Sequence, residues 1–169
     1  MRQLKLVLLG LSLLFCFLGC FTVKYSAGGI DIPAEAKTVC VKQFQNNASL
    51  VNLKLSNELT TQLKDRFRSS TKLDLVDSRG DLYIEGEITS YALSSVALGA
   101  DMATMNRLTI TIRIKYENRF DEEKNVERTF SRYADFSESQ SLRQAEDGLV
   151  PQICEALIDD IFAATVGNW

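Results

Sequence analysis

The stretch from Asn106 to Phe120, NRLTITIRIKYENRF, decides the fold. Apolar residues occupy every second position from Leu108 to Tyr116, and polar or charged residues occupy the positions between them. Because successive side chains of a strand point to opposite faces, this alternation predicts a strand with one face in a core and the other in water. The apolar face requires a second layer to cover it.

Two amphipathic helices are available for that layer. Over residues 51–71, leucines recur every four positions and the opposite face is charged, which predicts a helix with one buried stripe. Residues 141–169 have apolar residues at the same spacing. Pro151 inside this second pattern predicts either a kink or a helix that begins near Gly148.

Short apolar or alternating segments predict further strands at 37–46, 72–77 and 81–93. In the last of these, the alternation starting at Leu82 places Tyr91 on the polar face, together with Glu85 and Glu87.

Residues 126–137 form one more predicted strand, whose burial is ambiguous because Arg128 and Arg132 share a face with Phe130. The order of all these elements predicts an α+β fold. We expect a two-layer sandwich in which two amphipathic helices pack on one face of a mostly antiparallel sheet.

The N-terminal residues have the composition of a secretion signal. Arg2 and Lys5 accompany an apolar core that is shorter than a membrane span, and Gly19 precedes Cys20. The sequence FLGC, residues 17–20, resembles a bacterial lipobox, although Phe replaces the usual Leu. A plain signal peptide or a short anchor helix is the alternative.

This interpretation divides the chain into three parts. Residues 1–19 would be a removed signal peptide, residues 20–36 a tether lipidated at Cys20, and residues 37–169 a single domain. After Cys20 the chain lacks the acidic cluster of a surface-export signal, so we expect an anchor that faces the periplasm.

Composition excludes several classes of function. The formal net charge of −3 argues against a nucleic-acid partner. The chain has no histidine, which removes Ser-His-Asp and Cys-His catalysis and the commonest transition-metal ligand. Glu85 and Glu87 could still act as an acid and base pair, but we expect no enzyme, cofactor or metal site. Cys40 and Cys154 are predicted to be buried thiols, with a disulfide as the alternative.

Two features suggest binding. Arg107, Arg113 and Lys115 share one strand face and, as a group, could contact the phosphates of an anionic amphiphile. For any single one of them, keeping an exposed strand soluble and discouraging edge pairing is the better explanation. The segment ALSSVALGADMATM, residues 92–105, joins two strands but is small and apolar, which is typical of an interface. The alternative is that both strands continue beyond the core.

Several segments together resemble the LptE family in its Bacteroidetes form. They are the FLGC lipobox and the stretches KTVCVKQFQN, LSNELTTQLKDRF, TKLDLVDSRGDLYIEGEITSY, NRLTITIRIKYEN and IDDIFAATVGNW. The resemblance implies two helices on one face of a sheet of about four strands. It also implies an outer-membrane lipoprotein that plugs the LptD β-barrel, assists its assembly and binds lipopolysaccharide during delivery to the outer leaflet.

Under this resemblance the two binding features become candidate sites. Arg107, Arg113 and Lys115 are candidate lipopolysaccharide contacts, and the residues Val96, Leu98 and Met102 are candidate barrel contacts. A periplasmic lipoprotein that binds another amphiphile, or that scaffolds an envelope complex, is the alternative function.

Overall fold

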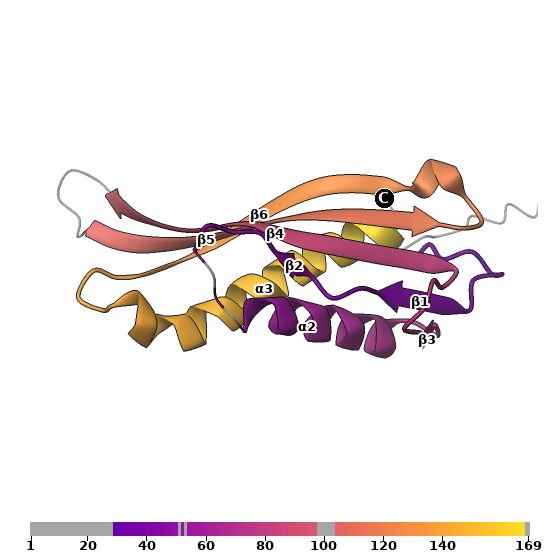
Figure 1. Ribbon diagram of the computed structural model, residues 1–169, viewed down its shortest axis with the longest axis horizontal. Coiled ribbons are helices and arrows are strands. Elements are labelled where there is room, and N and C mark those ends of the chain that lie inside the picture. Colours follow the sequence, from indigo (N-terminus) through magenta and orange to yellow (C-terminus); the bar gives the residue numbers. More distant parts are fainter. Residues whose placement is uncertain (1–28, 51, 53, 98–103, 168–169) are drawn as a thin grey trace, which may run out of the picture.

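Two helices cover one face of a twisted six-stranded sheet in the computed structural model of the protein, which describes residues 29–50, 52, 54–97 and 104–167 (Figure 1). The elements in chain order are β1 Thr38–Val41, β2 Gln45–Asn46, α2 Leu55–Ser70, β3 Asp74–Leu75, β4 Leu82–Ala97, β5 Thr104–Asn118, η1 Glu122–Lys124, β6 Val126–Ser137 and α3 Leu142–Val166.

The sheet is mixed, with the strand order β3-β1-β4-β5-β6 and with β2 also paired to β4. The ladders β4–β5 and β5–β6 are antiparallel, whereas β1 is parallel to both β3 and β4, and β2 is parallel to β4. The α+β class and the two helices are therefore confirmed, but a mostly antiparallel sheet of about four strands is wrong. Helix α2 carries the chain back between β2 and β3, and such a crossover makes β3 parallel to β1.

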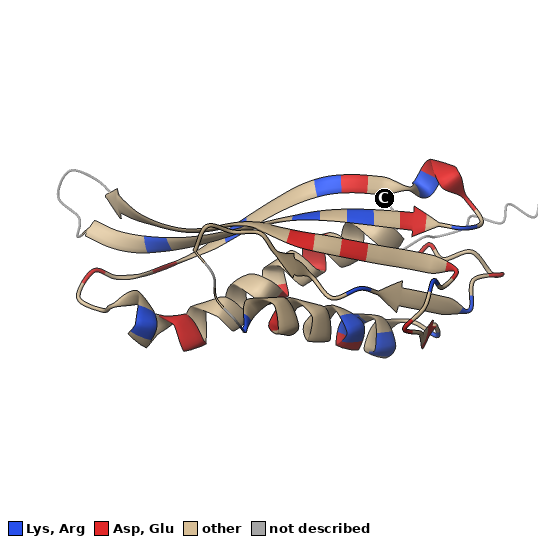
Figure 2. Cartoon of the chain, viewed as in Figure 1, with Lys and Arg blue, Asp and Glu red and all other residues tan. Residues whose placement is uncertain are grey.

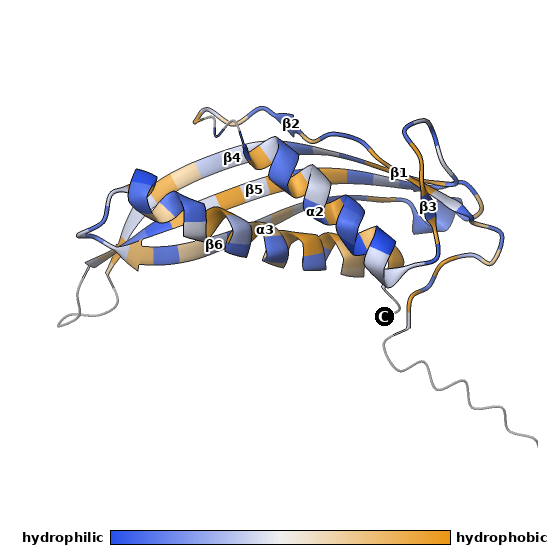
Figure 3. Ribbon diagram, turned by 90° about the horizontal axis from the view of Figure 1, so that it is seen from below, coloured by the Kyte–Doolittle hydropathy of each residue, from blue (hydrophilic) through white to orange (hydrophobic). Residues whose placement is uncertain are grey.

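Strand β5 lies inside the sheet and behaves as its sequence predicts. Its five alternating apolar side chains are buried, namely Leu108, Ile110, Ile112, Ile114 and Tyr116. They face the helix layer, where the apolar stripes of both helices turn toward the sheet (Figure 3).

Strand β4 departs from simple alternation. Its register against β5 shifts between Ile88 and Ser90. Such a shift moves all later side chains to the other face. Tyr91 is consequently buried opposite Ile110, and the prediction that it lies on the polar face is wrong.

The two helices pack against each other as well as against the sheet. Phe67 of α2 and Phe162 of α3 meet with ring centroids 5.3 Å apart. Helix α3 begins after Ser141, whose capping box with Gln144 fixes the first turn. The helix continues through the exposed Pro151, so a start near Gly148 is wrong.

Strand β6 combines apolar and charged residues on its inner face. Ala134 and Phe136 are buried, while Arg132 on the same face reaches Asp160 of α3 with two hydrogen bonds of 2.5 and 2.6 Å. The ambiguous pattern of this edge strand thus reflects an ion pair to the helix layer.

The apolar segment 92–105 is largely strand. Strand β4 extends to Ala97 and β5 begins at Thr104, as the alternative of continuing strands predicts. Residues 98–103, which include Leu98 and Met102, lie outside the described residues.

Candidate functional site

The sheet face that the helices leave open carries a ladder of charged residues. On this face Glu85 of β4 lies opposite Lys115 of β5, and Glu87 lies opposite Arg113. Lys115 in turn lies opposite Glu127 of β6. These alternating charges cover only one half of the long strands (Figure 2).

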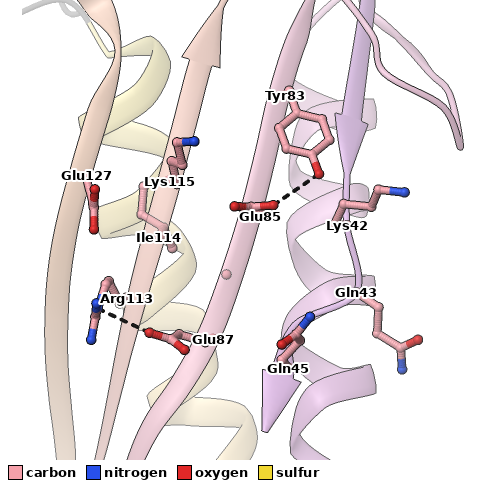
Figure 4. Close-up of a pocket in the computed structure, with 11 residues that line it drawn as sticks. Lys42, Gln43, Gln45, Tyr83, Glu85, Glu87, Arg113, Ile114, Lys115 and Glu127 are labelled. Carbon is pink, nitrogen blue, oxygen red and sulfur yellow. Dashed lines mark hydrogen bonds and ion pairs between the residues drawn. The ribbon is translucent and has the colours of Figure 1, made fainter. Parts of the chain in front are cut away.

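A cavity of about 570 Å³ opens over this ladder, and we call it the outer-face cavity (Figure 4). Its lining residues are Lys42, Gln43, Gln45, Tyr83, Glu85, Gly86, Glu87, Arg113, Ile114, Lys115 and Glu127. The segment between β1 and β2 forms one side, β4 the floor, and β5 with β6 the other side.

The charged side chains of the cavity are partly paired. The Arg113 guanidinium lies 3.2 Å from the Glu87 carboxylate, which also accepts a 2.8 Å hydrogen bond from Asn47 Nδ2. Tyr83 Oη donates to Glu85 at 3.1 Å. Burial, followed by this bond to Glu85, raises the pKa of the Tyr83 hydroxyl, so Tyr83 remains a hydrogen-bond donor at neutral pH.

Lys115 points along its strand toward Glu117, with 2.9 Å between Nζ and the carboxylate. The hydrogen bond from Lys115 lowers the pKa of Glu117, and Arg79, 2.7 Å from the same carboxylate, lowers it further. The same bond raises the pKa of Lys115. Both predicted cations of the cavity are thus already beside carboxylates.

Arg107 belongs to a different part of the face. Six residues along β5 separate it from Arg113, a distance of about 20 Å. Its guanidinium donates to both oxygens of Asp135, at 2.7 and 2.9 Å, and stacks 3.7 Å from the centroid of the Tyr133 ring. The structure therefore brings Arg113 and Lys115 together in one cavity and leaves Arg107 outside it.

Sequence reasoning missed the four lining residues that lie outside β4 and β5, namely Lys42, Gln43, Gln45 and Glu127. Lys42 and Gln45 reach the cavity because β1 and β2 both run parallel to β4, and Glu127 reaches it from the far strand β6. No local sequence pattern predicts that these residues line one cavity, because their proximity depends on the order of the strands in the sheet.

A second cavity, also of about 570 Å³, lies at the end of the sheet beside Asp81. The Asp81 carboxylate accepts hydrogen bonds from the backbone N–H groups of Lys37 and Thr38, at 2.9 and 3.1 Å, and from Thr38 Oγ1 at 2.9 Å. These bonds, led by the one from Lys37, lower the pKa of Asp81. Asp81 thus holds the start of β1 in place.

The remaining predicted sites are placed as follows. Val96 lies half-buried near the end of β4, while Cys20 falls outside the residues described. Cys40 and Cys154 are free buried thiols rather than a disulfide, and burial raises the pKa of Cys154 to about 12. Within the described part of the chain, no helix is both long and apolar enough to cross a membrane.

Solved structures share the fold at low sequence identity. A Xanthomonas campestris protein is 14% identical with a TM-score of 0.53, and the match covers 81% of this chain and 92% of that one. A neuraminyllactose-binding hemagglutinin homologue of Helicobacter pylori is 12% identical with a TM-score of 0.51, over 82% and 90%. A hypothetical protein of Chlamydia trachomatis is 10% identical with a TM-score of 0.50, over 77% and 98%.

At identities this low, the similarity to these structures shows only that the fold is shared. Among curated proteins, none matches the sequence significantly. The family model LptE, described as lipopolysaccharide-assembly, matches residues 36–165, which include nearly all of the described helices and strands. The chain therefore belongs to the LptE family of lipopolysaccharide-assembly proteins.

Proposed function

We propose that this protein is an outer-membrane lipoprotein that plugs an LptD β-barrel, assists assembly of the barrel and binds lipopolysaccharide on its way to the outer leaflet. The observation that carries the proposal is the family match over residues 36–165. In this proposal Cys20 bears the lipid after residues 1–19 are removed, and the anchor faces the periplasm.

The shape and surface of the domain support a role as a plug. The lumen of a large outer-membrane barrel is polar. A plug therefore needs a folded body with polar surfaces, and the open sheet face with its charged ladder provides one (Figure 2). Arg107, Arg113 and Lys115 all lie on this face and remain our candidate lipopolysaccharide contacts.

The β4–β5 hairpin is the candidate contact with the barrel wall or its loops. It extends beyond the strands β1 and β2, whose pairing with β4 ends at Ile88. Val96 lies near the end of β4, and in the sequence Leu98 and Met102 fall between β4 and β5. Leu93 of β4 is a large apolar side chain that is 46% exposed. Exposed apolar side chains at the end of a domain are typical of a protein interface.

Affinity capture of the tagged full chain from detergent-solubilised outer membranes tests the plug. We expect a large β-barrel protein to copurify in a stable complex. The double variant Val96→Asp/Leu98→Asp should capture less barrel because it places charge in the proposed contact. Leu50→Asp is the matched control, since Leu50 is 56% exposed and lies outside the hairpin.

This experiment tests the plug and the hairpin contact independently of each other. If no barrel copurifies with the wild-type chain, the plug is wrong, and a different partner would favour a scaffold in another envelope complex. If the hairpin variant, folded by circular dichroism, captures as much barrel as Leu50→Asp, the hairpin is not the contact.

Metabolic labelling with a palmitate analogue tests the anchor. We expect label on the wild-type protein and none on Cys20→Ala. Cys16→Ala is the matched control, because Cys16 lies inside the apolar core of the signal and should not affect lipidation. Equal labelling of Cys20→Ala would refute the anchor at this residue.

A further inference from the structure

We propose that the outer-face cavity binds an uncharged, hydroxyl-rich saccharide rather than a phosphate group. This inference rests on the charges and hydrogen-bonding groups that line the cavity. Only the source of the sugar, the oligosaccharide part of lipopolysaccharide, rests on the function proposed above.

The charge of the cavity disfavours a phosphate. Three cationic side chains line it, Lys42, Arg113 and Lys115, and three carboxylates face them, Glu85, Glu87 and Glu127. The strong side-chain contacts to a phosphate are charge-assisted hydrogen bonds from Arg or Lys, and carboxylates beside them repel it. Here it would meet a balanced site, and it would have to displace Glu87 from Arg113 and Glu117 from Lys115.

The hydrogen-bonding groups of the cavity suit a sugar. Among the described residues, the side chains of Lys42, Gln45 and Glu127 make no hydrogen bond or ion pair, and they therefore stay available to a ligand. A sugar hydroxyl both donates and accepts, so it can bond a carboxylate and an amine or amide at once. A phosphate dianion only accepts, and the carboxylates would remain unsatisfied beside it.

The arrangement of these groups provides acceptors flanked by donors on two sides. Figure 4 shows Lys42 on one side of the β4 carboxylates and Arg113 and Lys115 on the other. Tyr83 stands at the end of the row of carboxylates and offers an aromatic ring edge and a hydroxyl that stays protonated. The volume of about 570 Å³ lies within the range of small-ligand sites.

The floor of the cavity is also rigid. The β4 carboxylates and the β5 cations stand on adjacent antiparallel strands whose register continues without a break over this region. Fixed cross-strand spacing keeps donors and acceptors in one pattern, so little ordering is needed when a ligand binds.

Titration of the detergent-solubilised full chain with two probes tests the inference. The first probe is a neutral hexose oligosaccharide cleaved from lipopolysaccharide and free of acidic sugars and phosphates, and the second is inorganic phosphate. We expect the neutral oligosaccharide to bind with an affinity that changes less than about twofold between low salt and about 0.5 M NaCl, because no ion pair with the ligand is screened. Inorganic phosphate should not displace it.

A pair of double variants locates the site. Glu85→Gln/Glu87→Gln keeps the side-chain shapes but weakens the acceptors, and we expect about tenfold weaker oligosaccharide binding. The same variant frees Arg113, so phosphate should begin to compete. Glu123→Gln/Glu138→Gln is the matched control, because both residues are exposed carboxylates outside the two cavities.

Three results would overturn the inference. They are no binding of the neutral oligosaccharide by the wild-type chain, binding that salt and phosphate abolish, and an equal loss in the control variant. Thermal unfolding of each variant shows whether it is folded. If the chain captures a barrel yet binds no oligosaccharide, the plug stands and only the saccharide site is wrong.

Discussion

Replacing Gly86 with alanine should destabilise the domain, whereas replacing Gly148 of α3 with alanine should stabilise it. An added Cβ at Gly86 would lie 2.3 Å from Cε1 of Phe44, 2.6 Å from Cζ and 2.7 Å from Cδ1. Carbon atoms normally approach to about 3.5–4.0 Å, so the ring would have to withdraw by more than about 1 Å. Phe44 is 2% exposed and has little room to do so.

The backbone of Phe44 is also fixed. Its N–H donates to Thr60 Oγ1 at 3.0 Å, and its carbonyl accepts a hydrogen bond from Ser56 Oγ, both on α2. Overpacking of this kind costs about 1–3 kcal/mol, and we expect the upper end. Lower entropy of the unfolded chain offsets about 0.4–1 kcal/mol. The net loss is about 2 kcal/mol, or about 4–8 °C in Tm.

Urea unfolding followed by circular dichroism measures this loss. Gly148→Ala is the matched control, since no atom lies within 4 Å of its added Cβ, and it should stabilise α3 by about 0.5–1 kcal/mol. Phe44→Leu removes the opposing ring atoms, so adding Gly86→Ala to Phe44→Leu should cost little more. A neutral Gly86→Ala variant, or purely additive effects in this cycle, would refute the packing argument.

Three further predictions concern charge and burial. Asp81 has a lowered pKa in the folded state, so its stabilisation is fully present above the unfolded pKa of about 3.9 and is lost as the pH falls from there through the lower folded pKa. Asp81→Asn should therefore lower the urea midpoint at neutral pH but not in strong acid. Arg132→Gln and Asp160→Asn each remove the ion pair between β6 and α3, so each should lower the urea midpoint at low salt. The double variant should have the same midpoint as either single variant, and about 1 M NaCl should reduce the loss of midpoint in all three. Iodoacetamide at mildly basic pH should alkylate neither Cys40 nor Cys154 until urea is added, and mass spectrometry of native samples that finds Cys154 modified would contradict its burial.

Much of the fold follows from local pattern. Strand β5 could be predicted because its period of two is unbroken from Leu108 to Tyr116, and α2 because its leucines keep helical spacing. Tyr91 was misplaced for a physical reason. One extra residue at the β4 irregularity changes the face of all later side chains, and nothing in the composition near Ile88 marks it.

The candidate site was harder to predict than the fold. Alternation along β5 correctly grouped Arg113 and Lys115 on one face, but strand order decides what faces them. Long-range pairing brings Lys42 beside Glu85 and carries Asp135 to Arg107. Such contacts depend on the register of strands distant in sequence, which no local pattern encodes.

The start of the described chain and the β4–β5 hairpin lie at opposite ends of the long axis of the domain. Ile30 pairs with Gly167, and the Asp31 N–H donates to the Val166 carbonyl, so the described chain starts beside the C-terminal end of α3. The β4–β5 hairpin lies at the opposite end of the molecule (Figure 1). The 15 residues of β5 span about 50 Å, more than the roughly 40–45 Å of a whole bilayer. If the proposed lipid on Cys20 is held at one leaflet, a body of this length is long enough to reach from that leaflet to the opposite face of the membrane.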